Sequence, residues 1–183
     1  ALQKRLPEVG DLVALGRAGA DFEAPGRLAE IVARERPDIV VNAAAYTAVD
    51  KAESEPERAA RINAVAVAEL ADACAATGAV LIHYSTDNVF DGSGTTPWRE
   101  DGPTAPLSVY GRTKRDGELA IERSGARAYT FRTSWVHAPG GNNFIAKILK
   151  AARDRDELKV IADQHGAPTS ALLIAEITIE TIR

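Results

Sequence analysis

Short apolar runs rich in β-branched residues alternate along this chain with longer segments in which apolar residues recur every three or four positions. We expect five buried strands, at 13–15, 39–41, 80–83, 128–131 and 158–161. We expect helices at 25–35, 55–76, 109–123 and 143–155, with a last one opening near Ser170. This alternation requires right-handed crossovers between parallel strands. The sequence therefore predicts an α/β fold, a Rossmann-type doubly wound parallel sheet with helices on both faces.

Several element boundaries have local causes. Pro25 and Pro56 suit first helical turns, Gly78 suits a helix C-cap, and Pro37 is expected to end the helix before it. One long irregular stretch, 87–107, directly follows a predicted strand. A loop of that length at the carboxyl end of a strand is typical of a ligand site.

The first strand and its glycine-rich turn are not seen in the sequence. The chain contains no Met and opens on Ala1 inside a helical segment, Ala1–Leu6, and G-x-G-x-x-G occurs nowhere. We therefore expect a fragment that lacks the first strand, and a processed N-terminus is the alternative. Its 183 residues suffice for one core. We expect an incomplete NAD(P)-binding domain over 1–135, and the start of a substrate-binding lobe together with the last sheet elements over 136–183.

Charge and composition disfavour several classes of protein. The 22 Lys and Arg and 26 Asp and Glu give a net charge of −4 and are scattered, which argues against nucleic-acid and anionic-membrane partners. No run approaches the roughly 18 apolar residues of a membrane span, and Cys74 is the single cysteine, so we expect a cytoplasmic protein. His83, His137 and His165 lie far apart, which predicts no metal site. We expect His83, inside a strand, to be buried with its hydrogen bonds satisfied.

Tyr110 and Lys114 stand four residues apart near the start of a predicted helix and share one face. An ammonium there lowers the pKa of a phenol, which suits Tyr110 to give a proton to a carbonyl oxygen. A surface contact between cation and ring is the alternative. Thr86, at the end of a predicted strand, is placed to hydrogen-bond the same oxygen. A turn or cap role for Thr86 is the alternative.

Small side chains follow the strand that ends at Val41, in Asn42-Ala43-Ala44-Ala45. They would let a nucleotide approach the backbone, although an Ala-rich junction packed under a helix has the same composition. Gly16-Arg17 follows an earlier strand, and an Arg at that place accommodates a 2′-phosphate, which favours NADPH over NADH. An ordinary solvated turn is the alternative for Arg17.

Five stretches together resemble the extended short-chain dehydrogenase/reductases, and among them the dTDP-4-dehydrorhamnose reductases. The Tyr110-Lys114 pair marks the superfamily, whereas Thr47-Ala-Val-Asp-Lys-Ala-Glu53 and Arg132-Thr-Ser-Trp-Val136 point to the reductases. The resemblance runs almost from end to end and is carried by residues 37–53, 83–87, 109–114, 132–136 and 163–169.

The resemblance implies an NAD(P)H-dependent oxidoreductase that reduces the C4 ketone of dTDP-4-dehydro-6-deoxy-L-mannose. Tyr110 would be the acid, Lys114 would hold the nicotinamide ribose, and Thr86 would bind the substrate oxygen. The implied cofactor-binding residues are Arg17, Asp21, Phe22, Ala43, Ala44, Ala45, Thr47, Tyr84, Tyr110 and Lys114. The implied substrate-binding residues are Val49, Thr86, Asp87, Asn88, Tyr110 and Trp135.

One departure concerns the substrate. The family usually has Tyr after Ser-Thr-Asp, whereas this chain has Asn88, so the sugar contact made there must differ. Another nucleotide-sugar epimerase or reductase of the extended family and a non-catalytic NADP-binding regulatory subunit are the alternatives. Some family members pair through a Mg²⁺-linked interface. No residue here decides between monomer and homodimer, so Mg²⁺ is left unassigned.

Overall fold

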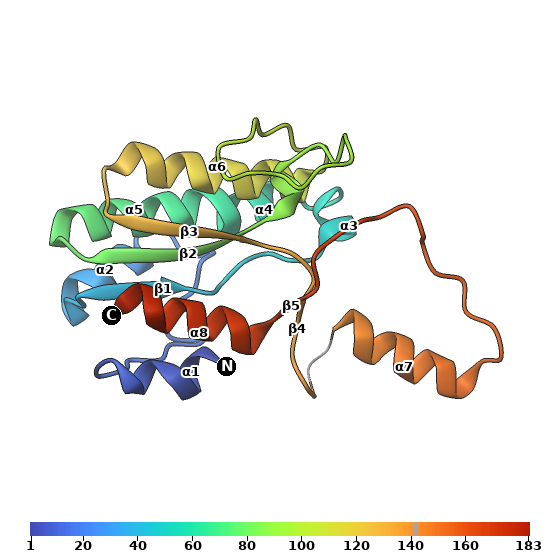
Figure 1. Cartoon of the computed structure of the whole chain (residues 1–183). Helices are drawn as coiled ribbons and strands as arrows, with labels where there is room; N and C mark the ends of the chain where they lie inside the picture. The colour runs from blue at the N-terminus through green and yellow to red at the C-terminus, as the bar shows by residue number, and fades with distance from the viewer. Residues whose placement is uncertain (141–142) are drawn as a thin grey trace. The chain divides into compact units, whose positions relative to one another are not determined.

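The computed structural model describes residues 1–140 and 143–183 (Figure 1). The chain divides into two compact units. The larger unit is Leu15–Arg132. The smaller unit combines Ala1–Ala14 with Thr133–Arg183.

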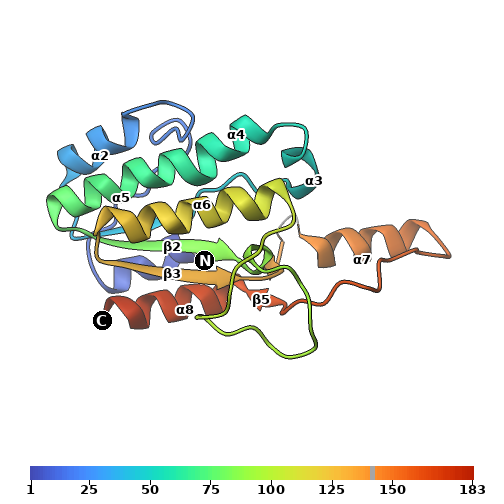
Figure 2. The same ribbon diagram turned by 90° about the horizontal axis from the view of Figure 1, so that it is seen from above.

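The larger unit is built on a three-stranded sheet of order β1-β2-β3. Its strands are β1 (Ile39–Asn42), β2 (Val80–Thr86) and β3 (Ala128–Thr133). β1 and β2 pair in parallel, with Ile39 opposite Val80 and Asn42 opposite His83. Figure 2 shows β3 running in the same direction as β2. The predicted α/β fold with a parallel sheet is thus confirmed.

Helices pack against this sheet in a layer in which α5 lies between α2 and α6 (Figure 2). The helical elements of the larger unit are α2 (Arg27–Glu35), α3 (Val49–Ala52), α4 (Pro56–Ala60), the π-helical turn η2 (Arg61–Val65), α5 (Ala66–Thr77), the 3-10 turn η3 (Asp87–Val89) and α6 (Val109–Ser124). The main core joins helix to sheet through Leu28, Val32, Val67, Leu70, Leu81 and Ile121.

The helix ends follow local chemistry. Gly78 caps the carboxyl end of α5 with φ +80°, a left-handed conformation that suits glycine, and Pro56 is the first residue of α4. Pro25 is not in a first helical turn as expected, because α2 begins at Arg27 after Gly26, which has φ +75°. The expected helical segment Ala1–Leu6 contains α1 (Leu2–Arg5), and the 3-10 turn η1 (Leu6–Glu8), which includes Pro7, follows it directly.

Two expected strands are wrong. Residues 13–15 and 158–161 form no strand, although both stretches are described. Val13 is 59% exposed and Ile161 69% exposed. A strand needs a hydrogen-bonding neighbour, and the described three-stranded sheet contains neither stretch.

The smaller unit holds a short parallel pair, β4 (Val136–His137) with β5 (Thr169–Ser170). Its helices are α1, α7 (Phe144–Asp154) and α8 (Ala171–Ile182), which begins after a Ser170 cap as expected. α1 packs against α8, and Arg5 reaches Glu176 at 3.4 Å.

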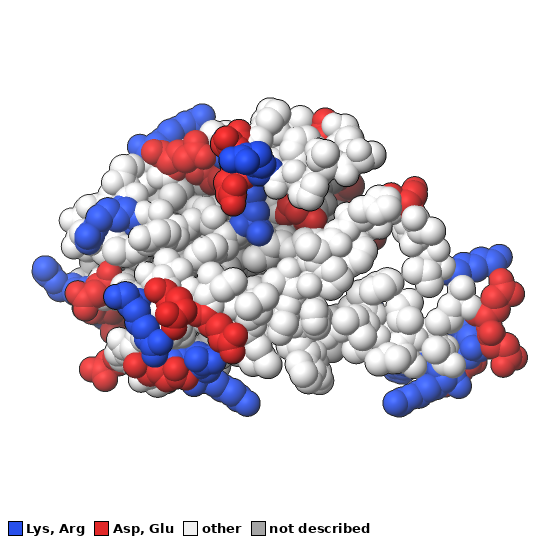
Figure 3. All heavy atoms as spheres, in the orientation of Figure 1, with Lys and Arg blue, Asp and Glu red and all other residues white. Residues whose placement is uncertain are grey.

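Charged side chains of both signs lie next to one another on the face drawn in Figure 3. Many are ion-paired within one helix or between neighbouring elements, as Arg115 is with Glu122 at 2.8 Å. Among the described residues, no helix combines the length and the apolar character needed to cross a lipid bilayer.

Gly117 lets α6 approach the π-helical turn closely. A Cβ at Gly117 would overlap the carbonyl oxygen of Asn63, which is backbone and cannot rotate away. We expect Gly117→Ala to destabilise the protein by about 2 kcal/mol, because over-packing displaces both helices. Gly10→Ala is the control, since nothing lies within 4 Å of its added Cβ. Urea unfolding measures both, and equal stabilities for the two variants would contradict the close approach.

Candidate active site

Polar side chains gather where β1 and β2 end, at the carboxyl edge of the sheet, which is where open α/β sheets bind ligands. β1 ends at Asn42 and β2 at Thr86. The start of α6 lies beside them, since Gly111 approaches the backbone of Asn88 so closely that a Cβ would overlap it. Three predicted residues, Thr86, Tyr110 and Lys114, therefore come from two adjacent elements.

Thr86 is 4% exposed and is the N-cap of η3. Its Oγ1 accepts hydrogen bonds from the Asn88 backbone N at 3.2 Å and from Asn88 Nδ2 at 3.1 Å, and it donates to Asp87 Oδ1 at 3.2 Å. Thr86 also hydrogen-bonds Tyr110. The cap interpretation is thus correct, and the same hydroxyl contacts the predicted acid.

Tyr110 is half-buried on the first turn of α6, whose N-cap Ser108 accepts a hydrogen bond from the Gly111 N at 3.0 Å. Burial raises the pKa of the Tyr110 phenol, the hydrogen bond with Thr86 lowers it, and the Asp87 charge raises it. The net direction is upward. The expected lowering by Lys114 is therefore wrong for this structure.

The position of Lys114 explains the difference, because its side-chain nitrogen is directed towards β2 and not towards Tyr110. The side chain is 1% exposed, and Nζ donates to the Tyr84 carbonyl oxygen at 2.8 Å and lies 3.2 Å from His83 Nε2. Burial lowers the pKa of Lys114 to about 8, against the opposing charge of Glu118. Lys114 is thus a buried amine that titrates near neutral pH.

His83 and Asn42 also lie at the candidate site, and the sequence did not predict their contacts there. His83 is completely buried, as expected, but its contact with Lys114 was not expected. Asn42 Nδ2 lies 3.1 Å from His83 Nδ1 across the parallel pair. Burial, and then the nearby Lys114, lower the pKa of His83 to about 3. The signal was available only in the strand register, which pairs these two positions.

Asn63 is a second missed residue, in the π-helical turn. Its Oδ1 accepts from Tyr46 N at 2.8 Å, and its Nδ2 donates to the Tyr46 carbonyl oxygen at 3.1 Å and to Thr113 Oγ1 at 3.2 Å. Asn63 thereby ties the segment after β1 to α6. Helical periodicity runs through this position, so no pattern marked it.

The segment after β1 presents small side chains, as predicted. Ala43, Ala44 and Thr47 are exposed, Ala45 is half-buried, and Val49 is 38% exposed. Such a surface leaves backbone accessible to a flat ligand beside Tyr46, which Asn63 fixes. The residues present therefore leave room for a dinucleotide at this edge of the sheet.

Arg17, Asp21 and Phe22 are already engaged within the larger unit. Arg17 Nη2 pairs with Glu23 Oε2 at 2.5 Å and its side chain is 68% exposed. Asp21 Oδ1 accepts from Glu23 N at 3.0 Å. Phe22 packs against the main core and against a second apolar cluster formed by Tyr46, Ala52, Ala59 and Ile62. Phe22 thus contributes to the core as well as to the surface.

Trp135 belongs to the smaller unit. It has φ +44°, a left-handed conformation that is strained for a bulky residue, and its side chain is 49% exposed. A Cβ on Gly166 would overlap the indole ring, so the two residues are in close contact. The sequence motif 163–169 therefore supports the ring of Trp135.

Glu118 anchors α6 through two arginines. It is 3% exposed and accepts from Arg132 Nε and Nη2 at 3.0 and 2.8 Å and from Arg115 Nη1 at 3.0 Å. Burial raises the pKa of Glu118, but hydrogen bonds from Arg132 and Ser85 and the charges of both arginines outweigh it, and the pKa is lowered. Arg132 also covers the Phe90 ring at 5.0 Å, which stacks on Trp98. The loop after β2 is thereby tied to α6.

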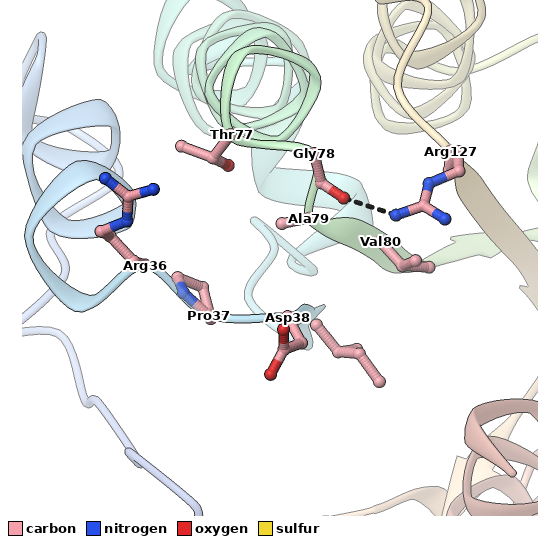
Figure 4. Close-up of a pocket in the computed structure, with 9 residues that line it drawn as sticks. Arg36, Pro37, Asp38, Thr77, Gly78, Ala79, Val80 and Arg127 are labelled. Carbon is pink, nitrogen blue, oxygen red and sulfur yellow. Dashed lines mark hydrogen bonds between the residues drawn. The ribbon is translucent and has the colours of Figure 1, made fainter.

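A pocket in the larger unit lies at the opposite ends of the strands (Figure 4). Its lining includes Asp38 and Val80, where β1 and β2 begin. Arg127 Nη2 donates a hydrogen bond to the Gly78 carbonyl oxygen at 2.6 Å. This pocket is therefore separate from the residues at the carboxyl edge. Over residues 1–140 and 143–183, no group of three or more His, Cys, Asp or Glu is placed to hold a metal ion.

The fold and the residues at its strand ends are those of the Rossmann-like dehydrogenase/reductase class. The chain matches the model of the RmlD substrate binding domain over residues 1–183, and it belongs to this family. It is 50% identical to the dTDP-4-dehydrorhamnose reductase of Salmonella typhimurium and 52% identical to that of Escherichia coli. Each comparison covers 100% of this chain and 62% of the relative, so the chain spans less than two thirds of those proteins.

Solved structures agree with the family. The chain is similar to the dTDP-4-dehydrorhamnose reductase of Bacillus anthracis, crystallised in complex with NADP, with a TM-score of 0.94 and 34% identity. The similarity covers 99% of this chain and 65% of that one. A reductase from Clostridium acetobutylicum gives the same TM-score and identity.

The lowered pKa of Glu118 links stability to pH. The folded state holds this carboxylate charged, so the stabilisation is present above its unfolded pKa of about 4.3 and is lost as pH falls through the folded pKa. We expect Glu118→Gln to cost roughly 3 kcal/mol at neutral pH, because two buried arginine contacts lose their charge partner. The difference from wild type should close below about pH 4.

Glu122→Gln is the matched control, since Glu122 pairs with Arg115 while its side chain is 60% exposed. It should cost less than about 1 kcal/mol. Urea unfolding at several pH values measures both variants. A Glu118→Gln deficit that persisted unchanged in acid would show that shape, and not charge, stabilises the cluster.

Proposed function

We propose that the protein containing this chain is an NAD(P)H-dependent oxidoreductase that reduces the C4 ketone of dTDP-4-dehydro-6-deoxy-L-mannose to dTDP-L-rhamnose. One observation carries the proposal: the Thr86 hydroxyl hydrogen-bonds the Tyr110 phenol, and a buried Lys114 follows one turn later on α6. The names of the reductases at 50 and 52% identity support the substrate. A nucleotide sugar is accordingly the substrate class.

Tyr110 is proposed as the acid that protonates the developing C4 alkoxide. A phenol whose pKa is raised by burial keeps its proton at neutral pH, which is the form that an acid needs. Thr86 stabilises the same oxygen through a hydrogen bond that strengthens as negative charge develops. Val49, Asp87, Asn88 and Trp135 are proposed to contact the sugar.

The cofactor would lie against the small residues after β1. Bound NAD(P)H supplies the hydride. Ala43, Ala44, Ala45 and Thr47 form the wall, and their exposure supports this placement. Arg17, Asp21, Phe22, Tyr84 and Lys114 are proposed to complete the site. The division into a cofactor domain over 1–135 and a substrate lobe over 136–183, and a cytoplasmic location, belong to the same proposal.

We expect Tyr110→Phe to lower turnover by about 10² to 10⁴, the usual contribution of a positioned acid, while leaving NADPH binding nearly intact. The measurement is loss of reduced-nicotinamide absorbance with the keto-sugar generated in the cuvette. Tyr129→Phe is the matched control, because Tyr129 is 52% exposed on β3.

Three outcomes separate the alternatives. Oxidation that depends on the keto-sugar and collapses only in Tyr110→Phe supports the reductase. Tight NADPH binding without oxidation would favour a regulatory subunit. Full activity of Tyr110→Phe would remove Tyr110 from the role of acid, whatever the substrate.

Arg17 is the residue proposed to favour NADPH over NADH. Its guanidinium is exposed, and Glu23, its partner, is also held by Arg58 at 2.8 Å, so Arg17 can turn to a 2′-phosphate without leaving Glu23 unpaired. We expect Arg17→Ala to weaken NADPH binding about tenfold relative to NADH, as loss of a charge-assisted hydrogen bond does. Arg34→Ala, an exposed pair with Glu35, is the control. Equal losses for both dinucleotides would contradict the assignment.

A further inference from the structure

The hydrogen-bond directions around Lys114 can be followed from the backbone inward. Ala44 N donates to Asn42 Oδ1 at 3.0 Å. Since a backbone N–H only donates, the oxygen of this amide must face Ala44, and Nδ2 must face the other way. Asn42 Nδ2 then lies 3.1 Å from His83 Nδ1.

An amide nitrogen can only donate, so His83 Nδ1 must accept. A neutral imidazole has one acceptor and one N–H, which places the proton of His83 on Nε2. The fully buried ring is neutral, since burial and the nearby Lys114 hold its pKa at about 3. The Nε2–H therefore points at Lys114 Nζ, 3.2 Å away.

An ammonium at that position would place donor against donor. A neutral amine has a lone pair that accepts the Nε2–H, and it keeps two hydrogens, one of which is donated to the Tyr84 carbonyl oxygen at 2.8 Å. We propose that Asn42 and His83 are positioning residues that hold Lys114 as a neutral amine over part of the working pH range. The protonation state of Lys114 does not depend on the proposed function. Only its consequence for the reaction, a charge in the active site that changes near neutral pH, rests on that function.

Other groups around Lys114 do not provide the same bias. Glu118, on α6, favours the ammonium but is itself paired with Arg115 and Arg132. Asp87 of η3 acts on Tyr110, and Glu53, after α3, accepts from Val109 N at 2.7 Å at the start of α6. From the π-helical turn and α5, the side chains of Asn63 and Val67 that meet α6 are uncharged. Burial, which lowers the pKa of Lys114 to about 8, acts in the same direction as the hydrogen bonds from β1 and β2.

The first test needs no variant, substrate or cofactor. Nitrogen chemical shifts of ¹⁵N-histidine-labelled protein show which ring nitrogen of His83 carries the proton. We expect a neutral ring protonated on Nε2 above pH 8, where Lys114 is the neutral amine. A proton on Nδ1 would reverse the hydrogen bonds that His83 makes with Asn42 and with Lys114, and it would overturn the proposal.

The second test uses an isosteric substitution to reverse the direction of the hydrogen bonds from residue 42 through His83 to Lys114. In Asn42→Asp a carboxylate faces His83, which draws the proton to Nδ1 and leaves Nε2 to accept from a Lys114 ammonium. We expect the Lys114 titration, followed by ¹³Cε-lysine shifts and assigned with Lys114→Met, to rise by at least about one pH unit from its wild-type midpoint near 8.

His83→Gln should also raise the Lys114 midpoint, because its amide oxygen can accept from the ammonium, whereas His165→Gln, on an exposed residue, should not. A midpoint unchanged in both Asn42→Asp and His83→Gln would overturn the proposal. Should neither variant fold, the tautomer in the native protein still decides. None of these results depends on turnover, so failure of the reductase assignment would be seen separately in the Tyr110→Phe assay.

Discussion

Burial of the Lys114 amine is the constraint on which the rest of the site depends. A buried amine must have its hydrogen bonds satisfied by protein, because water does not reach it. The Tyr84 carbonyl oxygen and His83 do so, and both come from β2. The partner of His83 is Asn42, which the parallel register places opposite it. Strand pairing thus determines the environment of a side chain that belongs to a helix.

The helix can reach that position because small residues line its inner face. Gly111 and Gly117 meet backbone oxygens of Asn88 in η3 and Asn63 in the π-helical turn, and any larger side chain there would push α6 away from those turns. Glu118 then fixes the helix laterally through Arg132, whose guanidinium also covers the loop after β2. The same contacts that stabilise α6 therefore place Tyr110 against Thr86.

Helices and strands that bury an apolar face can be predicted from the sequence. A segment whose structure depends on pairing with a neighbouring element cannot be predicted in this way. The periodicity of α2 and α6 and the apolar run of β2 are sufficient to locate them, because the apolar residues of each segment show which face is buried. Residues 13–15 have an equally apolar run but no neighbour in the described sheet, and pattern alone cannot show this. The spacing of Tyr110 and Lys114 is enough to predict that both lie near the start of one helix, as they do on α6. The contacts of Asn42 and Asn63 depend on register and on a π-helical turn, which leave no periodic signal.

The directions of the two pKa shifts change the relation expected between Lys114 and Tyr110. A fixed ammonium beside the phenol would lower the pKa of Tyr110, yet burial raises it, and the lysine nitrogen is turned to β2. Tyr110 accordingly keeps its proton before reaction. Lys114, with a pKa of about 8, changes charge at little free-energy cost near neutral pH. Its contribution to the site is then a charge that can be gained or lost, and the neighbours that set this balance are Asn42 and His83.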